Sequence, residues 1–120
     1  LMPKEKKMIT VEVKYILKSG QRYNFCSAIF VQKIDDSARR ESGNLKYDFD
    51  IPEDEPDILY LHELWENQQA LEAHAKMPHY AALAELKAKY VEETIIDKTE
   101  VSPHGCVAVK DDFPFIKGVV

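Results

Sequence analysis

The chain has 120 residues, of which 45% are hydrophobic and 31% charged, a balance typical of one compact globular domain. Sixteen Lys and Arg residues against 21 Asp and Glu give a net charge of −5, which argues against nucleic acid and anionic membranes as partners. No apolar run approaches the ~20 residues of a membrane span, and the N-terminal LMPKEKKM lacks the apolar segment of a leader. We therefore expect a cytoplasmic protein.

The two cysteines, Cys26 and Cys106, have no metal-binding spacing and are too few for a disulfide framework, so we expect reduced thiols. His104 and Cys106 together offer only two ligands, whereas a catalytic zinc ion takes three from the protein. The sequence thus predicts no metal site. No glycine-rich phosphate loop or dinucleotide fingerprint occurs, which agrees with the absence of a nucleotide cofactor.

The first predicted elements are a strand and a helix. Apolar and polar residues alternate over residues 9–17, a period typical of a half-buried strand, and Ser19-Gly20 follows as a turn. From Gln21 to about Arg40 there is no proline, and apolar residues recur at three- and four-residue spacing, at Cys26, Ile29, Phe30 and Ile34. This stripe predicts one helix lying on an apolar surface.

Two further strands are expected over residues 44–51 and 58–65. The apolar side chains of the first share one face, namely Leu45, Tyr47, Phe49 and Ile51. The acidic, proline-flanked stretch between the strands predicts a solvated loop, because proline donates no ladder hydrogen bond. Residues 58–65 are apolar on nearly both faces, which predicts a central strand covered on each side.

A helical region and a last strand complete the domain. Asn67 is a suitable N-cap for a helix whose inward positions are Leu71, His74 and Ala75. Pro78 interrupts that helix and begins another, which we expect to run to about Glu93 with Leu83, Leu86 and Tyr90 inward. Residues 94–101 form the predicted fourth strand, and residues 102–120 are too apolar for a free tail. We expect this extension to pack on the domain or on a partner chain.

The predicted order is β-α-β-β-α-β, the α+β ferredoxin-like arrangement with one antiparallel sheet and helices on one face. The second face of such a sheet is bare, yet residues 58–65 are apolar on both sides. Two copies packed sheet to sheet would bury that face and form a dimeric α/β barrel. We therefore predict a homodimer built from a domain at residues 9–101.

Four short motifs stand in register on these elements. They read E-x-G-x-x-x-Y from Glu41 to Tyr47, E-x-W at Glu63 and Trp65, L-x-x-H ending at His74, and P-H-Y from Pro78. With this spacing the sequence resembles the antibiotic biosynthesis monooxygenase family over roughly residues 9–101. The resemblance implies a pocket between helices and sheet with a histidine, His74, on its wall.

His74 is the predicted catalytic residue, because imidazole titrates near neutrality and can take a proton from a phenol and return it. The alternative is a buried, hydrogen-bonded structural histidine. Glu63 lies on an otherwise apolar strand, so its carboxyl group must be paired or protonated. It either orients a pocket group or makes a structural ion pair.

The remaining candidates for the substrate pocket are Tyr47, Trp65, His62 and His79. Trp65 offers a flat apolar wall for an aromatic ligand, and Tyr47 a hydroxyl for a substrate oxygen, although both fit ordinary core positions. His62 shares a strand with Glu63 but points to the other face, and the sequence leaves open which face meets the pocket. His79 matches the P-H-Y motif, and a histidine at a helix start is also often a surface residue.

The resemblance implies a cofactor-independent monooxygenase that oxidises an electron-rich aromatic or quinol substrate with dioxygen. The haem-degrading branch of the fold fits poorly, because the first strand contains no asparagine and the corresponding helix positions are His74 and Ala84. An isomerase of a small phosphorylated signal is the first alternative, although none of the strand positions expected to face the pocket is an arginine. A non-catalytic ligand-binding dimer is the second.

Overall fold

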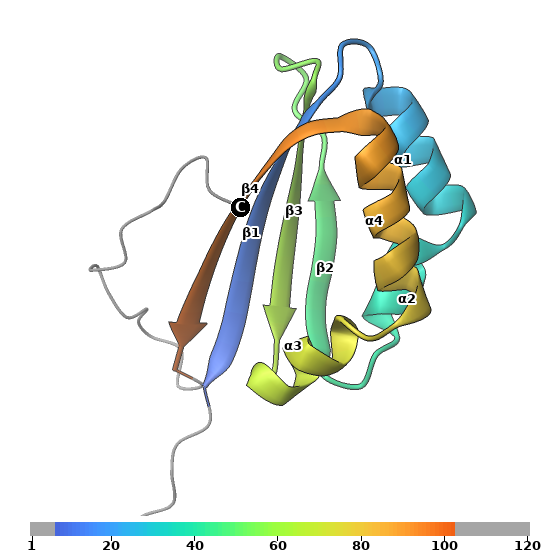
Figure 1. Cartoon of the computed structure of the whole chain (residues 1–120). Coiled ribbons are helices and arrows are strands. Elements are labelled where there is room, and N and C mark those ends of the chain that lie inside the picture. The colour runs from blue at the N-terminus through green and yellow to red at the C-terminus, as the bar shows by residue number, and fades with distance from the viewer. Residues whose placement is uncertain (1–6, 103–120) are drawn as a thin grey trace, which may run out of the picture.

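A computed structural model describes residues 7–102, which form one four-stranded sheet with helices α1, α2 and α4 across one face (Figure 1). The elements in chain order are β1 (Met8–Leu17), α1 (Arg22–Val31), α2 (Ile34–Arg39), β2 (Asn44–Asp50), β3 (Ile58–Trp65), α3 (Gln68–His74), α4 (Pro78–Tyr90) and β4 (Val91–Val101). The strand order is β2-β3-β1-β4, and all neighbouring pairs are antiparallel. The predicted ferredoxin-like α+β fold is therefore confirmed.

The core lies between the sheet and the helices. β1 buries its alternate residues, as its sequence predicted: Ile9, Val11, Val13, Tyr15 and Leu17. β3 buries Leu59, Leu61, Glu63 and Trp65 in the same way. Glu63 and Trp65 therefore face the helices, and Tyr60 and His62 face the opposite side of the sheet.

The single helix predicted from Gln21 to Arg40 is wrong, because the chain forms two helices there. α1 ends at Val31, and Lys33 adopts a left-handed conformation with φ of 56° before α2 begins. Buried Ile29 and Ile34 are five residues apart, a spacing that one straight helix cannot keep on a single face. The turn at Lys33 returns Ile34 to the core, while Phe30 is left 45% exposed.

Three other boundaries and faces differ from the prediction. β4 begins at Val91 and not at residue 94, because β1 extends to Leu17 and pairs with Val91. Only Tyr47 of the β2 apolar set is fully buried, because Leu45 lies at a register irregularity between Asn44 and Lys46 and Ile51 lies beyond the end of the strand. Ala75, predicted to face inward, is exposed just after the end of α3.

The N-cap prediction for Asn67 is confirmed, since its side-chain oxygen accepts a hydrogen bond from the backbone N–H of Ala70 at 2.8 Å. Cys26 is buried in α1 as a free thiol, and burial raises its pKa. His104, Cys106 and all of the 102–120 extension after Ser102 lie outside the described residues. None of the helices within residues 7–102 has the length and apolar character needed to cross a lipid bilayer.

Candidate active site

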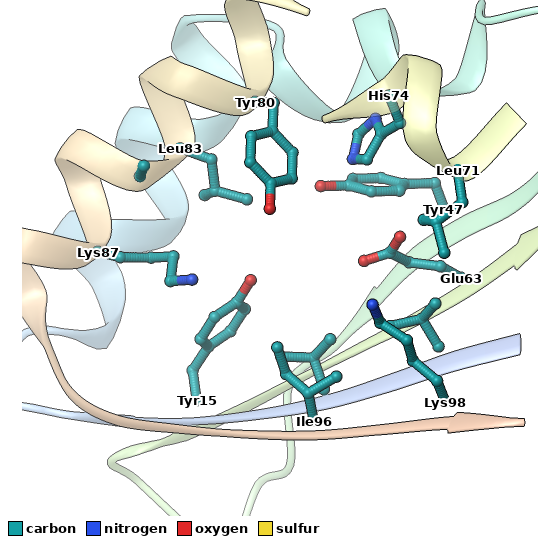
Figure 2. A pocket seen from close by; sticks show the side chains of 13 residues that line it. Tyr15, Tyr47, Glu63, Leu71, His74, Tyr80, Leu83, Lys87, Ile96 and Lys98 are labelled. Carbon is teal, nitrogen blue, oxygen red and sulfur yellow. The ribbon is translucent and has the colours of Figure 1, made fainter. Parts of the chain in front are cut away.

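A cavity of about 170 Å³ lies between the sheet and helices α3 and α4 (Figure 2). Its wall combines aliphatic side chains from the sheet and α4 with a set of polar and charged groups. It is lined by Val11, Val13, Tyr15, Tyr47, Glu63, Leu71, His74, Tyr80, Leu83, Ala84, Lys87, Ile96 and Lys98. The cavity opens where Lys98 of β4 and the 46% exposed Tyr80 of α4 reach solvent.

The sheet register places three of the polar groups in one row. Tyr47 of β2 pairs with Glu63 of β3, Glu63 pairs with Val11 of β1, and Val11 pairs with Lys98 of β4. Directly paired residues point to the same face of a sheet, so all four side chains face the helices. The row thus sets a hydroxyl, a carboxylate and an ammonium group across the floor of the cavity (Figure 2).

Glu63 is a buried carboxyl group, only 8% exposed, whose Oε1 accepts a hydrogen bond from Nε1 of Trp65 at 2.8 Å. Burial raises the pKa of Glu63 to about 7, although the Trp65 hydrogen bond and the positive charge of Lys98 oppose that effect. The group therefore exchanges a proton readily near neutral pH. A carboxyl group poised in this way suits acid–base chemistry.

His74 closes the other side of the cavity from the end of α3. Its ring is tilted against the indole of Trp65, with centroids 4.5 Å apart, and its Nδ1 lies 2.7 Å from Oε2 of Glu41. Burial lowers the pKa of His74, and the hydrogen bond to Glu41 partly offsets this. A neutral ring that donates its Nδ1–H to the carboxylate leaves the Nε2 lone pair free, and Figure 2 shows a ring nitrogen directed at the cavity.

Glu41 also binds His79, whose Nε2 lies 2.6 Å from the same Oε2 atom. The Glu41 and His79 side chains are 8% and 14% exposed, so the three groups form a largely buried hydrogen-bonded triad. Their three ligand atoms lie within 4.8 Å of one another, which makes this the set of side chains in residues 7–102 that could hold a metal ion. Without an ion, the carboxylate satisfies both imidazoles.

Gly43 explains how Glu41 reaches this position. A Cβ atom at residue 43 would lie 2.3 Å from the Cβ of Ala70, so the turn before β2 contacts α3 only because residue 43 has no side chain. The carbonyl of Gly43 also accepts a hydrogen bond from the N–H of Glu66 at 2.9 Å. The glycine of the E-x-G motif thus holds the turn against α3, with Glu41 beside His74.

Two lysines and three tyrosines complete the polar lining. The hydroxyls of Tyr15, Tyr47 and Tyr80 and the ammonium groups of Lys87 and Lys98 extend toward the same space (Figure 2). Burial raises the pKa values of Tyr15 and Tyr47 and lowers that of Lys87, which the negative charge of Glu63 partly restores. The two tyrosines therefore stay protonated at neutral pH and can donate hydrogen bonds to a ligand.

Three of the site residues proposed from the sequence line the cavity together, namely Tyr47, Glu63 and His74. Trp65 and His79 lie behind the cavity, where they contact Glu63 and Glu41. His62 does not join them, because it lies on the opposite face of the sheet and its Nδ1 contacts the carboxylate of Glu12. The sequence left open which face of β3 meets the helix-covered pocket, and the structure turns Glu63 and not His62 toward the helices.

Sequence reasoning missed Tyr15, Tyr80, Lys87 and Lys98 as lining residues. Tyr15 and Tyr80 were visible as inward strand and motif residues, but nothing in the sequence distinguished them from core. The two lysines also supply the cationic charge that we looked for only among arginines. Glu41 was visible only as the first residue of a motif, because its histidine partners are 33 and 38 positions away.

Comparison of the sequence with known families gives one match. The model of the antibiotic biosynthesis monooxygenase family matches residues 8–86, which include β1 to β3 and most of α4. The chain therefore belongs to the antibiotic biosynthesis monooxygenase family. No curated protein sequence matches the chain.

Solved structures with the same fold include several from bacteria. A conserved protein from Bacteroides thetaiotaomicron superposes with a TM-score of 0.72 at 23% identity, covering 80% of this chain and 99% of its own. A Nitrosomonas europaea protein described by the same family name gives a TM-score of 0.69 at 20% identity, over 84% and 94% of the two chains. A Caulobacter crescentus protein described in the same way gives a TM-score of 0.70 at 18% identity, covering 80% of this chain and 91% of its own. These similarities show the shared fold.

Proposed function

We propose that this chain is a monooxygenase that oxidises a small electron-rich phenol or quinol with dioxygen, without a resident cofactor. Membership of the antibiotic biosynthesis monooxygenase family supports the reaction class. The observation that carries the proposal is the contact between His74 and Glu41, which holds a neutral imidazole at the wall of a cavity lined with hydroxyl and ammonium groups. Such a group can accept the proton of a phenol that binds beside it.

The first proposed step is proton transfer from the substrate hydroxyl to Nε2 of His74. The imidazolium that forms is stabilised by the carboxylate of Glu41, which remains ionised and hydrogen-bonded at Nδ1. The phenolate is stabilised by the hydroxyl of Tyr47, which lies on the same side of the cavity as His74, and by the net positive charge of the cavity wall. The protein thereby raises the electron density of the ring that must reduce dioxygen.

The second step transfers one electron from the phenolate to dioxygen, and the resulting radical pair combines to form a carbon–oxygen bond. Protonation gives a ring hydroperoxide, which loses water to yield a quinone. One oxygen atom of dioxygen thus enters the product and the other leaves as water. Glu63, with a pKa near 7, is placed to supply or accept a proton during this loss of water.

We also propose that two copies pair through the open faces of their sheets. Ile16, Ile58, Tyr60, Leu64 and Ile95 are only half-buried on this face, and no helix of the described chain covers it. These apolar side chains alternate with charged ones such as Glu12, Lys14 and Asp97, and a second sheet placed on this face would bury the apolar ones. Pairing would cover β3, the interior strand whose residues are apolar on both sides.

An isomerase of a small phosphorylated molecule is the alternative that the two lysines favour, since phosphate needs cationic partners. The two functions differ in their use of oxygen. We would incubate the purified chain separately with a single-ring hydroquinone and with sugar phosphates, and follow oxygen uptake and the absorption spectrum. Oxygen uptake above the rate of spontaneous quinol oxidation supports the monooxygenase. Conversion of a phosphorylated compound without oxygen uptake would contradict it.

A further inference from the structure

The charged groups of the cavity do not balance. Its wall carries one carboxylate, Glu63, and two ammonium groups, Lys87 and Lys98. The side chains that line the cavity are therefore positive by one charge when Glu63 is ionised and by two when it is protonated, although the whole chain has a net charge of −5. The carboxylate of Glu41 lies behind His74 and offsets one of these charges on that side. A positive cavity in an acidic protein favours an anionic ligand over a neutral one.

The positive charge that no carboxylate of the cavity wall neutralises lies at Lys87 and not at Lys98. Lys98 is exposed at the mouth of the cavity and shares a cross-strand row with Glu63, whose charge it partly neutralises. Lys87 is half-buried, and within residues 7–102 its Nζ has no ion-pair partner within 4.0 Å. Its Nζ lies over the ring of Tyr15, 5.8 Å from the ring centroid. Glu63 acts on this ammonium group only from beyond ion-pair distance, so a desolvated cation of this kind is stabilised when an anion binds beside it.

The polar groups of the cavity also fall at two separate sides. Figure 2 shows Lys87 and Tyr15 at one side, and His74, Tyr47 and Glu63 at the other. Ile96 lies between the two sides on the sheet, Leu83 gives an apolar wall above Lys87, and the ring of Tyr80 stands between Leu83 and His74. A ligand that satisfies both sides has a hydroxyl at one end, an apolar middle and an anionic group at the other end.

The size of the cavity limits that middle to one ring. An engineered apolar cavity of about 150 Å³ in another protein holds a single benzene molecule. The cavity in this chain measures about 170 Å³, a similar volume, which suits one substituted ring. Its opening beside Tyr80 and Lys98 lets small substituents extend toward solvent.

We propose that the substrate is a single-ring phenol or hydroquinone that carries a carboxylate, and that Lys87, assisted by the Tyr15 hydroxyl, binds this carboxylate while the phenolic hydroxyl meets His74. This inference rests on the proposed oxygenase function for the identity of the reacting group, but the anion site itself is defined by the lysine. Lys87 is thus a specificity-determining residue. A neutral quinol would bind the same cavity more weakly.

The test is isothermal titration calorimetry of the full chain with 4-hydroxybenzoate and with its neutral analogue 4-hydroxybenzamide, neither of which needs to react. At pH 7 we expect the parent to bind the carboxylate about tenfold more tightly than the amide, as a single desolvated charge pair provides. Lys87→Gln should remove this preference by weakening only the carboxylate, and Lys87→Arg should retain it. Lys89→Gln is the matched control, because Lys89 is exposed two positions along the same helix.

Three results would overturn the assignment. These are equal affinity of the parent for the two ligands, a carboxylate preference that survives Lys87→Gln in a folded variant, and tighter binding of phenyl phosphate than of 4-hydroxybenzoate. Circular dichroism melting shows whether each variant is folded. Oxygen uptake with a neutral hydroquinone tests the oxygenase function separately from the carboxylate site at Lys87. Turnover without carboxylate preference would remove this inference alone, and carboxylate preference without turnover of any quinol would leave the anion site and remove the oxygenase.

Discussion

Nδ1 of His74 lies 2.7 Å from Oε2 of Glu41, a contact that joins the last residue of α3 to the turn before β2. The carboxylate fixes both the tautomer and the orientation of the imidazole, as a buried carboxylate does in other acid–base sites. In the proposed mechanism Glu41 is thus a positioning residue for His74, the proposed base. The same oxygen atom also binds His79, so the two histidines can be compared through one shared partner.

His74→Gln should lower the turnover of a quinol by roughly 10²- to 10⁴-fold per folded molecule, the range typical for loss of a general base. His79→Gln is the control, because it removes a hydrogen bond to the same Glu41 oxygen without removing a side chain that lines the cavity. Steady-state oxygen uptake, normalised to the folded fraction, gives the comparison. Equal losses in the two variants would assign His74 a structural role.

Glu63→Gln should change how stability depends on pH. Burial raises the pKa of Glu63 from its ordinary value of 4.5 to about 7, so the folded protein holds this proton more tightly than the unfolded chain. The resulting stabilisation is complete below about pH 4.5 and is lost as pH rises through 7. Between pH 5 and pH 8 the parent should lose up to about 3 kcal/mol relative to Glu63→Gln.

Urea denaturation of both proteins at the two pH values measures this difference. Glu66→Gln is the control, since Glu66 is exposed just beyond the end of β3. If the free energy of unfolding changes with pH by the same amount in the parent and in Glu63→Gln, then the pKa of Glu63 is not raised in the folded protein. Its place in the proposed proton transfers would then be lost.

Gly43→Ala should damage both stability and activity. The added Cβ would lie 2.3 Å from the Cβ of Ala70, so either the turn or α3 must move. We expect a loss of about 1–3 kcal/mol in the free energy of unfolding, as is usual for overpacking, with lower turnover because Glu41 is displaced from His74. Ala70→Gly in the same chain should recover part of the activity by removing the clash. Full activity of Gly43→Ala alone would show that the close approach of residue 43 to Ala70 does not determine the position of Glu41.

Sequence reasoning was most accurate for β1 and β3 and least accurate for the helices. In a strand with one face on the core, apolar and polar residues alternate along the sequence, so the alternation itself predicted that Val11 and Tyr15 are buried. The break at Lys33 depends on a left-handed backbone conformation that no residue type at that position announces. The row of polar groups could not be predicted for another reason. Lys98 lies beside Glu63 only through two strand registers, which require β1, β3 and β4 all to be placed.

Purified protein should be colourless and contain no stoichiometric flavin, haem or metal, because dioxygen is proposed to react with the substrate anion itself. Absorption spectra and elemental analysis check this. A tightly bound metal ion would most plainly occupy the cluster of Glu41, His74 and His79, whose ligand atoms lie within 4.8 Å of one another. One metal per chain, lost in His79→Gln, would contradict the account, because a metal-bound His74 could not act as the base.

Sedimentation velocity tests the proposed sheet-to-sheet dimer. The parent should sediment as a dimer at micromolar concentration, and Ile95→Glu should shift it toward monomer, because that position lies half-buried on the open face. Lys89→Gln, on the outer surface of α4, should leave the distribution unchanged. A parent that sediments as a monomer would remove this part of the proposal.

Isotope labelling shows directly whether an oxygen atom of dioxygen enters the product, as a monooxygenase requires. A hydroquinone is turned over by the purified chain under ¹⁸O₂ in unlabelled water, and the product is examined promptly by mass spectrometry. The account predicts one ¹⁸O atom in the hydroxylated quinone and one in water, with incorporation lost in His74→Gln and retained in His79→Gln. A product that carries no ¹⁸O beyond the level of an enzyme-free control would contradict the monooxygenase assignment.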